Sequence, residues 1–200
     1  MKAVMAEVPM DVLRWRSRIG ADRWDEMWEG VLHMAPAPNR MHQDFQGDLE
    51  TWLRIHWARP RACKVYHDVN LASHGGWPDK DYRIPDLVLV TPDSPLVDHN
   101  EYLEGAPAVV IEIYSPGDET MEKLPFYMGL GVPEVWVIDR DTREPTIYVL
   151  AGADYEEQLP GPALWLQSAA TGIQFRATLG RQLAIQIVGD PNTLEMLPHD

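Results

Sequence analysis

The chain has 200 residues, about the length of a single domain. With 45% hydrophobic and 24% charged residues, its composition is that of a folded protein and excludes a disordered one. All apolar runs are shorter than the roughly 18 residues that span a bilayer, and Glu7 and Asp11 interrupt the stretch where a secretion signal is apolar. The single cysteine, Cys63, and the lack of zinc-type Cys/His spacing fit a reducing compartment, so we expect a cytoplasmic protein without membrane association.

The net charge of -14 argues against a protein that coats nucleic acid broadly. The charge is uneven: residues 1–83 hold 12 Lys/Arg and 12 Asp/Glu, so the whole imbalance lies in residues 84–200. Any anion-binding face is therefore expected from the first half, where a solvated basic edge is the alternative. The candidate basic residues are Arg14, Arg16, Arg18, Arg54, Arg59, Arg61 and Lys64.

The first part of the chain predicts a helix, a hairpin and a second helix. Residues 9–19 have the spacing of a short amphipathic helix, and residues 24–34 are typical of two short strands that turn near Gly30. Asn39 is a suitable cap for the next helix, because hydrophobic residues recur after it at three- and four-residue steps. The residues at this spacing are Met41, Phe45, Leu49, Trp52, Leu53 and His56.

The rest of the chain consists mainly of predicted strands. The expected elements are strands over 64–71, 82–90 and 108–114, a helical stretch over 118–130, strands over 132–140 and 144–150, and short strands up to about residue 187. This order predicts an α/β fold in one domain over residues 1–188. Residues 189–200, which contain prolines, are expected to form a flexible tail.

Two carboxylates occur in strands that are otherwise apolar. Alternation places Glu112 on the same face as Val110, where an ionised carboxylate costs several kcal/mol unless a cation or a proton compensates it. Asp86 begins the apolar run of the preceding strand, on the face of Val88. If these strands are neighbours, at about 4.8 Å, both carboxylates can coordinate one hard divalent cation, and magnesium suits such a site.

Each carboxylate also has an ordinary structural explanation. Aspartate after proline is a common turn pair, so Asp86 could begin its strand by accepting local backbone hydrogen bonds. Glu112 could be a strand-end residue in an ion pair with Arg83 or Lys123. The pair of carboxylates therefore indicates a metal site more strongly than either residue alone.

Lys123 follows Glu112 just beyond the next turn. A helix that returns over the strand would bring its ammonium beside the carboxylates, where it could orient water or stabilise charge on a phosphate oxygen, whereas a solvated helix lysine is the alternative. Pro125 leaves two arrangements open. A helix that begins near Glu122 keeps Pro125 in its first turn, and a helix that begins at Asp118 is kinked there and turns Lys123 in another direction.

Longer motifs appear in a fixed order between about residues 20 and 150. They are RWDEMWEGVLHMAPAP, then His42, IPDLVLV, and VVIEIYSPGDETMEKLPFYMGLGVPEVWVIDRDTREPTIYVL. This series resembles the Uma-two family of restriction endonuclease-like proteins, within the PD-(D/E)xK nuclease superfamily. The resemblance implies an α/β restriction-endonuclease-like core, with a central mixed β-sheet flanked by helices and an amino-terminal hairpin. It also implies a magnesium-dependent nuclease-type site and often a homodimer.

The resemblance assigns roles to individual residues. Asp86 and Glu112 match the family's metal ligands, and the backbone carbonyl of Ile113 matches the usual additional ligand. The superfamily's lysine stands two residues after the acidic residue, where this chain has Tyr114. The family resemblance points instead to Lys123, on the following helix.

Other polar residues carry weaker signals. Glu29 matches an acidic position of the family's hairpin motif, although a turn carboxylate is more often solvated. The histidines show no metal-ligand spacing, so structural or exposed positions are expected for all of them. They are His33, His42, His56, His67, His74, His99 and His199.

The leading hypothesis is an endonuclease that hydrolyses DNA phosphodiester bonds with Mg²⁺, for which Mn²⁺ could substitute. Asp86 and Glu112 would hold the metal and Lys123 would assist the attacking water. The alternative is a catalytically inactive module that keeps the nuclease fold for binding or interaction. Tyr114 in place of the pattern's lysine, Pro125 beside Lys123 and the acidic second half favour that alternative.

Overall fold

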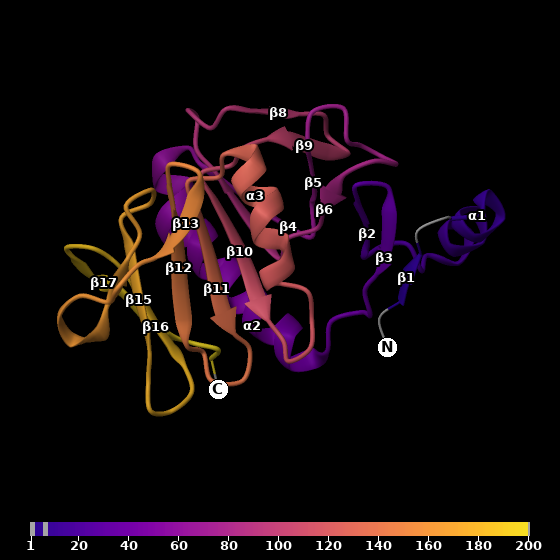
Figure 1. Cartoon of the computed structure of the whole chain (residues 1–200). Coiled ribbons are helices and arrows are strands. Elements are labelled where there is room, and N and C mark those ends of the chain that lie inside the picture. Colours follow the sequence, from indigo (N-terminus) through magenta and orange to yellow (C-terminus); the bar gives the residue numbers. More distant parts are fainter. Residues whose placement is uncertain (1–2, 6–7, 200) are drawn as a thin grey trace.

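The computed structural model describes residues 3–5 and 8–199 (Figure 1). The centre is a mixed six-stranded sheet in the order β13-β12-β11-β10-β7-β4, in which β10 and β11 run parallel and the other neighbours antiparallel. Its strands are β4 (Lys64–His67), β7 (Leu87–Val90), β10 (Val109–Tyr114), β11 (Glu134–Asp139), β12 (Pro145–Ala151) and β13 (Asp154–Glu157). The predicted mixed central sheet is confirmed.

Helices cover both faces of this sheet (Figure 1). The residues of β10 alternate as predicted: Ile111 packs towards α2 (Arg40–Trp52), and Val110 packs towards α3 (Leu124–Leu130). On the α2 side the core also includes residues of a four-stranded C-terminal sheet. The strand that carries Glu112 is therefore buried between two layers.

The predicted second helix is confirmed, with its cap. The side chain of Asn39 accepts a hydrogen bond from the backbone N–H of His42 at 3.0 Å. The helix continues as a π-helical segment, Leu53–Ala58, and a 3₁₀ turn, Arg59–Arg61. The apolar side of α2, including Phe45 and Trp52, is buried against the central sheet.

The helix after β10 begins late. A 3₁₀ turn covers Met121–Lys123, and α3 begins at Leu124 with Pro125 in its first turn. Of the two arrangements that the sequence left open, the late start is the observed one. The missing N–H of Pro125 costs nothing there, because N–H groups of a first helical turn have no partner within the helix.

The amino-terminal hairpin belongs to a second sheet, of seven strands. Its order is β1-β3-β2-β6-β5-β9-β8, with β1 (Ala3–Met5), β2 (Asp25–Trp28), β3 (Val31–Met34), β5 (Asn70–Ala72), β6 (Tyr82–Arg83), β8 (Leu96–Asp98) and β9 (Tyr102–Gly105). The strands expected over 64–71 and 82–90 are each divided between the two sheets. The first break lies at Asp68, where φ is 47°, and the second lies at residues 84–86.

The expectation of a flexible tail is wrong for most of residues 189–200. Asp190–Leu197 form β17, which pairs with β16 (Leu183–Ile187) in the C-terminal sheet β14-β15-β16-β17. The other members are β14 (Leu166–Gln167) and β15 (Ile173–Ala177), and a 3₁₀ turn covers Pro162–Leu164. The carbonyl of Thr193 accepts a hydrogen bond from the indole of Trp52 at 2.9 Å, so β17 is fixed to α2.

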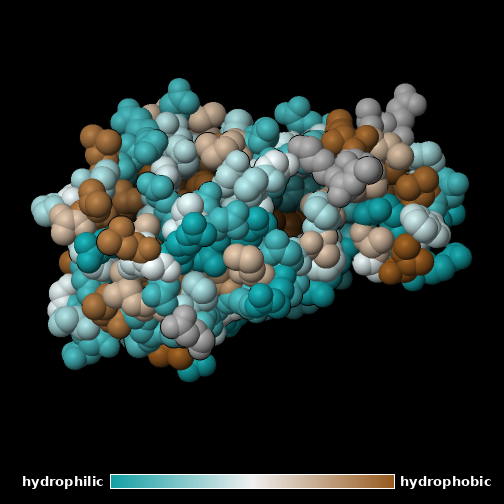
Figure 2. All heavy atoms as spheres, turned by 90° about the horizontal axis from the view of Figure 1, so that it is seen from below, coloured by the Kyte–Doolittle hydropathy of each residue, from teal (hydrophilic) through white to brown (hydrophobic). Residues whose placement is uncertain are grey.

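The surface seen in Figure 2 is mostly hydrophilic, with separate hydrophobic patches. Helix α1 (Met10–Ile19), the helix predicted over residues 9–19, buries none of its residues and projects from the body (Figure 1). Within the described part of the chain, no helix is both long and apolar enough to cross a membrane.

Candidate active site

Asp86 lies where the chain passes from the hairpin sheet into the central sheet, just before β7. Its Oδ2 accepts a hydrogen bond from the backbone N–H of Ile113 in β10 at 2.6 Å. Its Oδ1 lies 2.8 Å from Nε2 of His42 in α2. The partners of Asp86 are thus distant in sequence, and the explanation by a local turn does not account for them. The carboxylate is instead held between a strand and a helix.

Glu112 lies beside Asp86, as the alternation predicted. Strands β7 and β10 are antiparallel neighbours with Val110 opposite Val88, so the next pair on that face is Glu112 and Asp86. The side chain of Glu112 is only 4% exposed. The hydroxyl of Tyr127, from α3, donates a hydrogen bond to its Oε1. The two carboxylates therefore meet at one end of the central sheet.

Lys123 completes the group. Its Nζ lies 3.2 Å from Oε1 of Glu112 and 2.9 Å from Oε1 of Glu26. Because α3 starts at the next residue, the ammonium is at the helix start and turns back over β10. The structure therefore unites the three residues that the sequence singled out, Asp86, Glu112 and Lys123. The ion pair between Glu112 and Lys123, which the structural explanation of Glu112 predicted, is also present.

The acidic residue that the hairpin contributes is Glu26 rather than Glu29. Glu29 is exposed at the hairpin turn with φ 50°, and its N–H donates to Asp81. Glu26 is buried, and its Oε1 also accepts a hydrogen bond from the N–H of Ile84 at 2.8 Å. The difference follows from position in the hairpin, since Glu26 lies within β2, where Asp25 and Met27 are also buried, and Glu29 follows the strand's last residue.

The helix α2 supplies two residues that the sequence reasoning missed. His42 is buried and contacts Asp86, whereas it was expected to be merely structural or exposed. One turn later, Gln46 donates hydrogen bonds to the carbonyl of Asp86 at 2.8 Å and to Asp68 at 3.0 Å. Their four-residue spacing places both on one helical face, which is the signal that could have identified them.

The electrostatics follow from burial and from an excess of negative charge. Burial raises the pKa of Glu112 to about 8, against the opposing charge of Lys123. Burial alone would lower the pKa of Lys123, but the charges of Glu112 and Glu26 raise it above its ordinary value. Burial also lowers the pKa of His42, but the hydrogen bond to Asp86 and the charges of Asp86 and Asp68 together outweigh burial, so the pKa is raised overall. Lys123 therefore stays protonated at neutral pH beside the carboxyl groups of Glu112, Glu26 and Asp86.

This donor set fits a hard divalent cation. Among residues 3–5 and 8–199, no three Asp, Glu, His or Cys side chains form a ready-made metal cluster, so side chains alone offer the pair Asp86 and Glu112. The N–H of Ile113 points to Asp86, and the carbonyl of a strand residue faces the same edge as its N–H, so this carbonyl lies on the Asp86 side. Two carboxylates, one carbonyl and water are ligands that Mg²⁺ accepts. A cation would also offset the cost of ionising the buried Glu112.

A model of a known protein family matches most of the chain. The family model Uma2, described as "Putative restriction endonuclease", matches residues 11–182. The chain belongs to the Uma2 family. The resemblance proposed from the motifs is thus confirmed, and all the Uma2 site residues named above lie within the matched range.

A solved structure supports the fold of this Uma2 protein. The crystal structure of a "putative nuclease belonging to DUF820" from Anabaena variabilis matches it with a TM-score of 0.58 and 17% identity. The match covers 73% of this chain and 82% of the other. No protein of curated function matches the chain. The nuclease-like α/β fold is therefore shown, and the reaction has to be argued from the site.

Proposed function

We propose that this protein is a Mg²⁺-dependent endonuclease that hydrolyses phosphodiester bonds of DNA. Membership in a family described as restriction endonucleases supports a hydrolase acting on nucleic acid. The single observation that carries the proposal is the meeting of Asp86, Glu112 and Lys123, from three separate segments of the chain, with Nζ of Lys123 3.2 Å from Glu112. Two carboxylates next to a buried ammonium provide both metal ligands and a cation for phosphate chemistry.

Asp86 and Glu112 would hold the metal, with the Ile113 carbonyl as a further ligand. Bound Mg²⁺, or Mn²⁺ in its place, would activate water and offset negative charge on the phosphate. The existing hydrogen bonds prepare Asp86 for this role: His42 and the Ile113 N–H orient its two oxygens. His42 is thus a positioning residue.

Lys123 would act as a donor and not as a base. Because neighbouring carboxylates raise its pKa, the ammonium keeps its proton at neutral pH. It can therefore donate a hydrogen bond to the attacking water or to a phosphate oxygen, where charge grows in the transition state. Glu26 also contacts the ammonium, at 2.9 Å, and so helps to fix its position.

Two further expectations extend this proposal. We propose that the protein works in the cytoplasm, where DNA is accessible to it, and that it forms a homodimer, as the family resemblance implies. A homodimer would present two sites to the two strands of a duplex. Sedimentation analysis at micromolar protein concentration tests the oligomeric state, and a monomer at all concentrations would contradict it.

The experiment is cleavage of supercoiled and single-stranded DNA at low salt, with Mg²⁺, with Mn²⁺ and with EDTA. We expect the wild type to cut only with metal and Asp86→Ala to be inactive while its melting remains cooperative. Asp93→Asn, which changes an exposed aspartate in the same part of the chain, is the matched control and should cut normally. An active Asp86→Ala protein would overturn the assignment.

A second candidate is a nuclease-fold module that performs no hydrolysis. Its support is that each oxygen of Asp86 and Glu112 already has a hydrogen-bonding partner, and that Tyr114 occupies the superfamily's lysine position. The melting temperature discriminates the two, because a competent site is stabilised by millimolar Mg²⁺ or Mn²⁺. No shift with either metal, together with no cleavage, would favour the inactive module.

A further inference from the structure

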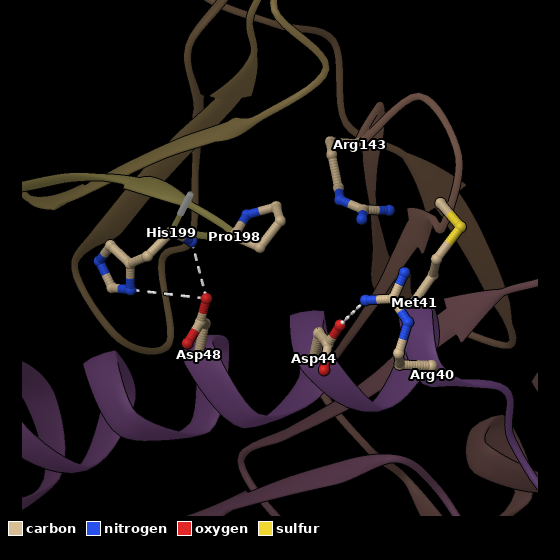
Figure 3. A pocket seen from close by; sticks show the side chains of 7 residues that line it. All are labelled: Arg40, Met41, Asp44, Asp48, Arg143, Pro198 and His199. Carbon is tan, nitrogen blue, oxygen red and sulfur yellow. Dashed lines mark hydrogen bonds and ion pairs between the residues drawn. The ribbon is translucent and has the colours of Figure 1, made fainter.

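A cleft of about 450 Å³ lies against α2, beside the turn that joins β11 and β12 (Figure 3). It is lined by Arg40, Met41, Asp44, Asp48, Arg143, Pro198 and His199. The volume is within the range of small-molecule and cofactor sites. None of the residues that line it belongs to the candidate active site.

Arg143 is a buried cation in this cleft. The residue is 4% exposed, and its guanidinium lies over the ring of Phe45 at 4.4 Å. Among residues 3–5 and 8–199, Nε and Nη1 of Arg143 have no hydrogen-bond partner. Figure 3 shows the guanidinium pointing from the β11–β12 turn into the space above α2. Burial of a guanidinium without hydrogen-bond acceptors costs free energy, and a bound anion would offset that cost.

The acidic residues near Arg143 are engaged elsewhere. Oδ1 of Asp139 accepts hydrogen bonds from the backbone N–H groups of Asp141 and Thr142. The carboxylate of Asp141 is paired with Arg140 at 2.9 Å. Both carboxylates are close enough to raise the pKa of Arg143, yet burial lowers it overall. Neither of them supplies the missing acceptor.

The two acidic residues of the cleft itself also have their own partners. Asp44 pairs with Arg40 at 2.7 Å. Asp48 accepts a hydrogen bond from the backbone N–H of His199 at 2.7 Å and lies 3.5 Å from its Nδ1. Figure 3 shows these pairs at the α2 side of the cleft, with Arg143 facing them. Within the part of the chain that the structure describes, the Arg143 guanidinium forms no ion pair with the acidic residues of the cleft.

We propose that this cleft binds a phosphate of the nucleic-acid backbone beside the scissile one, with Arg143 as its main ligand. This inference rests on the proposed function and names a substrate contact outside the metal site. The fork of an arginine fits phosphate oxygens, and stacking on Phe45 fixes its plane. Arg40 and Met41 at the cleft are 81% and 47% exposed, so the cleft is open to solvent beside them.

The position of the cleft agrees with a flanking phosphate. Successive helix residues are about 100° apart, so Met41 lines the cleft while His42 contacts Asp86. On the other side, the N–H of Arg140 donates to the carbonyl of Tyr114 at 2.9 Å, at the end of β10. The first turn of α2 and the β11–β12 turn thus connect the cleft directly with the metal site.

The test measures binding by the full chain in EDTA, where no cleavage takes place. Anisotropy of short fluorescein-labelled duplex and single-stranded DNA is followed at several salt concentrations for the wild type, Arg143→Met and Arg176→Met. Arg176 is the matched control because it also lies over an aromatic ring, Trp165 at 5.0 Å, but in the C-terminal sheet. Melting with and without millimolar inorganic phosphate forms the second arm.

We expect Arg143→Met to weaken DNA binding about tenfold and to reduce the salt slope by about 1, and Arg176→Met to change neither. Phosphate should raise the melting temperature of the wild type but not of Arg143→Met. If Arg143→Met fails to fold, Arg143→Lys, which keeps the charge and loses the fork, should bind DNA with intermediate affinity.

Equal DNA affinity of the wild type and Arg143→Met would overturn the proposal. If the phosphate shift still depended on Arg143 in that case, the cleft would take free phosphate and not nucleic acid. The proposed function fails separately, when the wild type does not cut DNA with metal. Normal metal-dependent cutting with unchanged binding by Arg143→Met would contradict the cleft inference alone.

Discussion

Nζ of Lys123 lies 3.2 Å from Oε1 of Glu112, although the two residues come from different elements and a turn separates them. The contact exists because α3 begins only after Lys123, with Pro125 in its first turn. In the proposed function, Lys123 takes the role of the lysine that the superfamily pattern places at the position of Tyr114.

Lys123→Met should reduce the rate of metal-dependent DNA cleavage about a hundredfold or more. The reason is the loss of a fixed donor to the developing phosphate charge. Single-turnover cleavage measures the effect. Lys64→Met, at an exposed lysine, is the control and should leave the rate unchanged. Equal rates for Lys123→Met and the wild type would remove Lys123 from the mechanism.

Two glutamates of the hairpin provide a matched pair. Glu26→Gln should lower the cleavage rate about tenfold, because Lys123 loses the charge that fixes its ammonium at 2.9 Å. Glu29→Gln should have no effect, since Glu29 is exposed at the turn. Rates of the two variants, compared side by side, check this prediction. A larger effect of Glu29→Gln would restore the family-motif assignment.

His42→Gln should weaken metal binding while the chain remains folded. His42 orients Asp86 at 2.8 Å, and loss of such a partner typically costs 10- to 100-fold in metal affinity. The Mg²⁺ concentration that gives half the maximal rate should therefore rise, with a smaller change in the maximal rate. His67→Gln, at an exposed histidine, is the control. An unchanged Mg²⁺ requirement would show that His42 does not position Asp86.

The metal-free protein should lose stability with rising pH through Glu112. Burial raises the pKa of this group from 4.5 to about 8, so between these values the folded state binds a proton that the unfolded state has released. This contribution is complete below pH 4.5 and is lost as the pH rises through about 8. In EDTA, the melting temperature of the wild type relative to Glu112→Gln should fall over that window. A constant difference would contradict the raised pKa.

The C-terminal strand should be necessary for stability. Leu197, in β17, is fully buried, so Leu197→Ala should cost about 2–5 kcal/mol of unfolding free energy. Leu194→Ala, in the same strand but 43% exposed, should cost less than about 0.5 kcal/mol. Urea unfolding measures both. Equal, small effects would indicate that residues 189–200 behave as the flexible tail expected from the sequence.

The core of the site could be predicted because its signals are local. A two-residue alternation marked Glu112 as a carboxylate on a buried face, and Pro85 marked Asp86 at the start of its strand. Their pairing then needed only that β7 and β10 be neighbours, which the structure confirms. The start of α3 could be reduced to two arrangements by one rule about proline.

The remaining site residues depend on contacts between distant segments. Glu26 reaches Lys123 only because the hairpin sheet lies beside α3, and His42 reaches Asp86 only because α2 crosses the end of β7. Local spacing can mark such residues as sharing one face of an element, but it does not show which distant residues they contact. The strand β17 was missed for the same reason, since its pairing with β16 and its bond to Trp52 are not visible in a segment with Pro191 and several polar residues.

The distribution of charge along the sequence did not indicate Arg143 as an anion ligand. The anion-binding face was expected from residues 1–83, whereas the proposed phosphate ligand lies in the acidic half. Net charge counts every carboxylate, but the carboxylates near Arg143 are each paired with another group. What matters for the proposed site is that Arg143 has no hydrogen-bonded acceptor among the described residues, and this depends on the tertiary structure.

The most direct test of the metal-nuclease assignment is calorimetric titration of Mn²⁺ into the wild type, Asp86→Asn and Glu112→Gln. The account predicts one binding site in the wild type and its loss in both variants, with Asp93→Asn retaining it. Binding of Mn²⁺ with unchanged affinity by both Asp86→Asn and Glu112→Gln would contradict the account, because these two carboxylates would then not be the metal ligands.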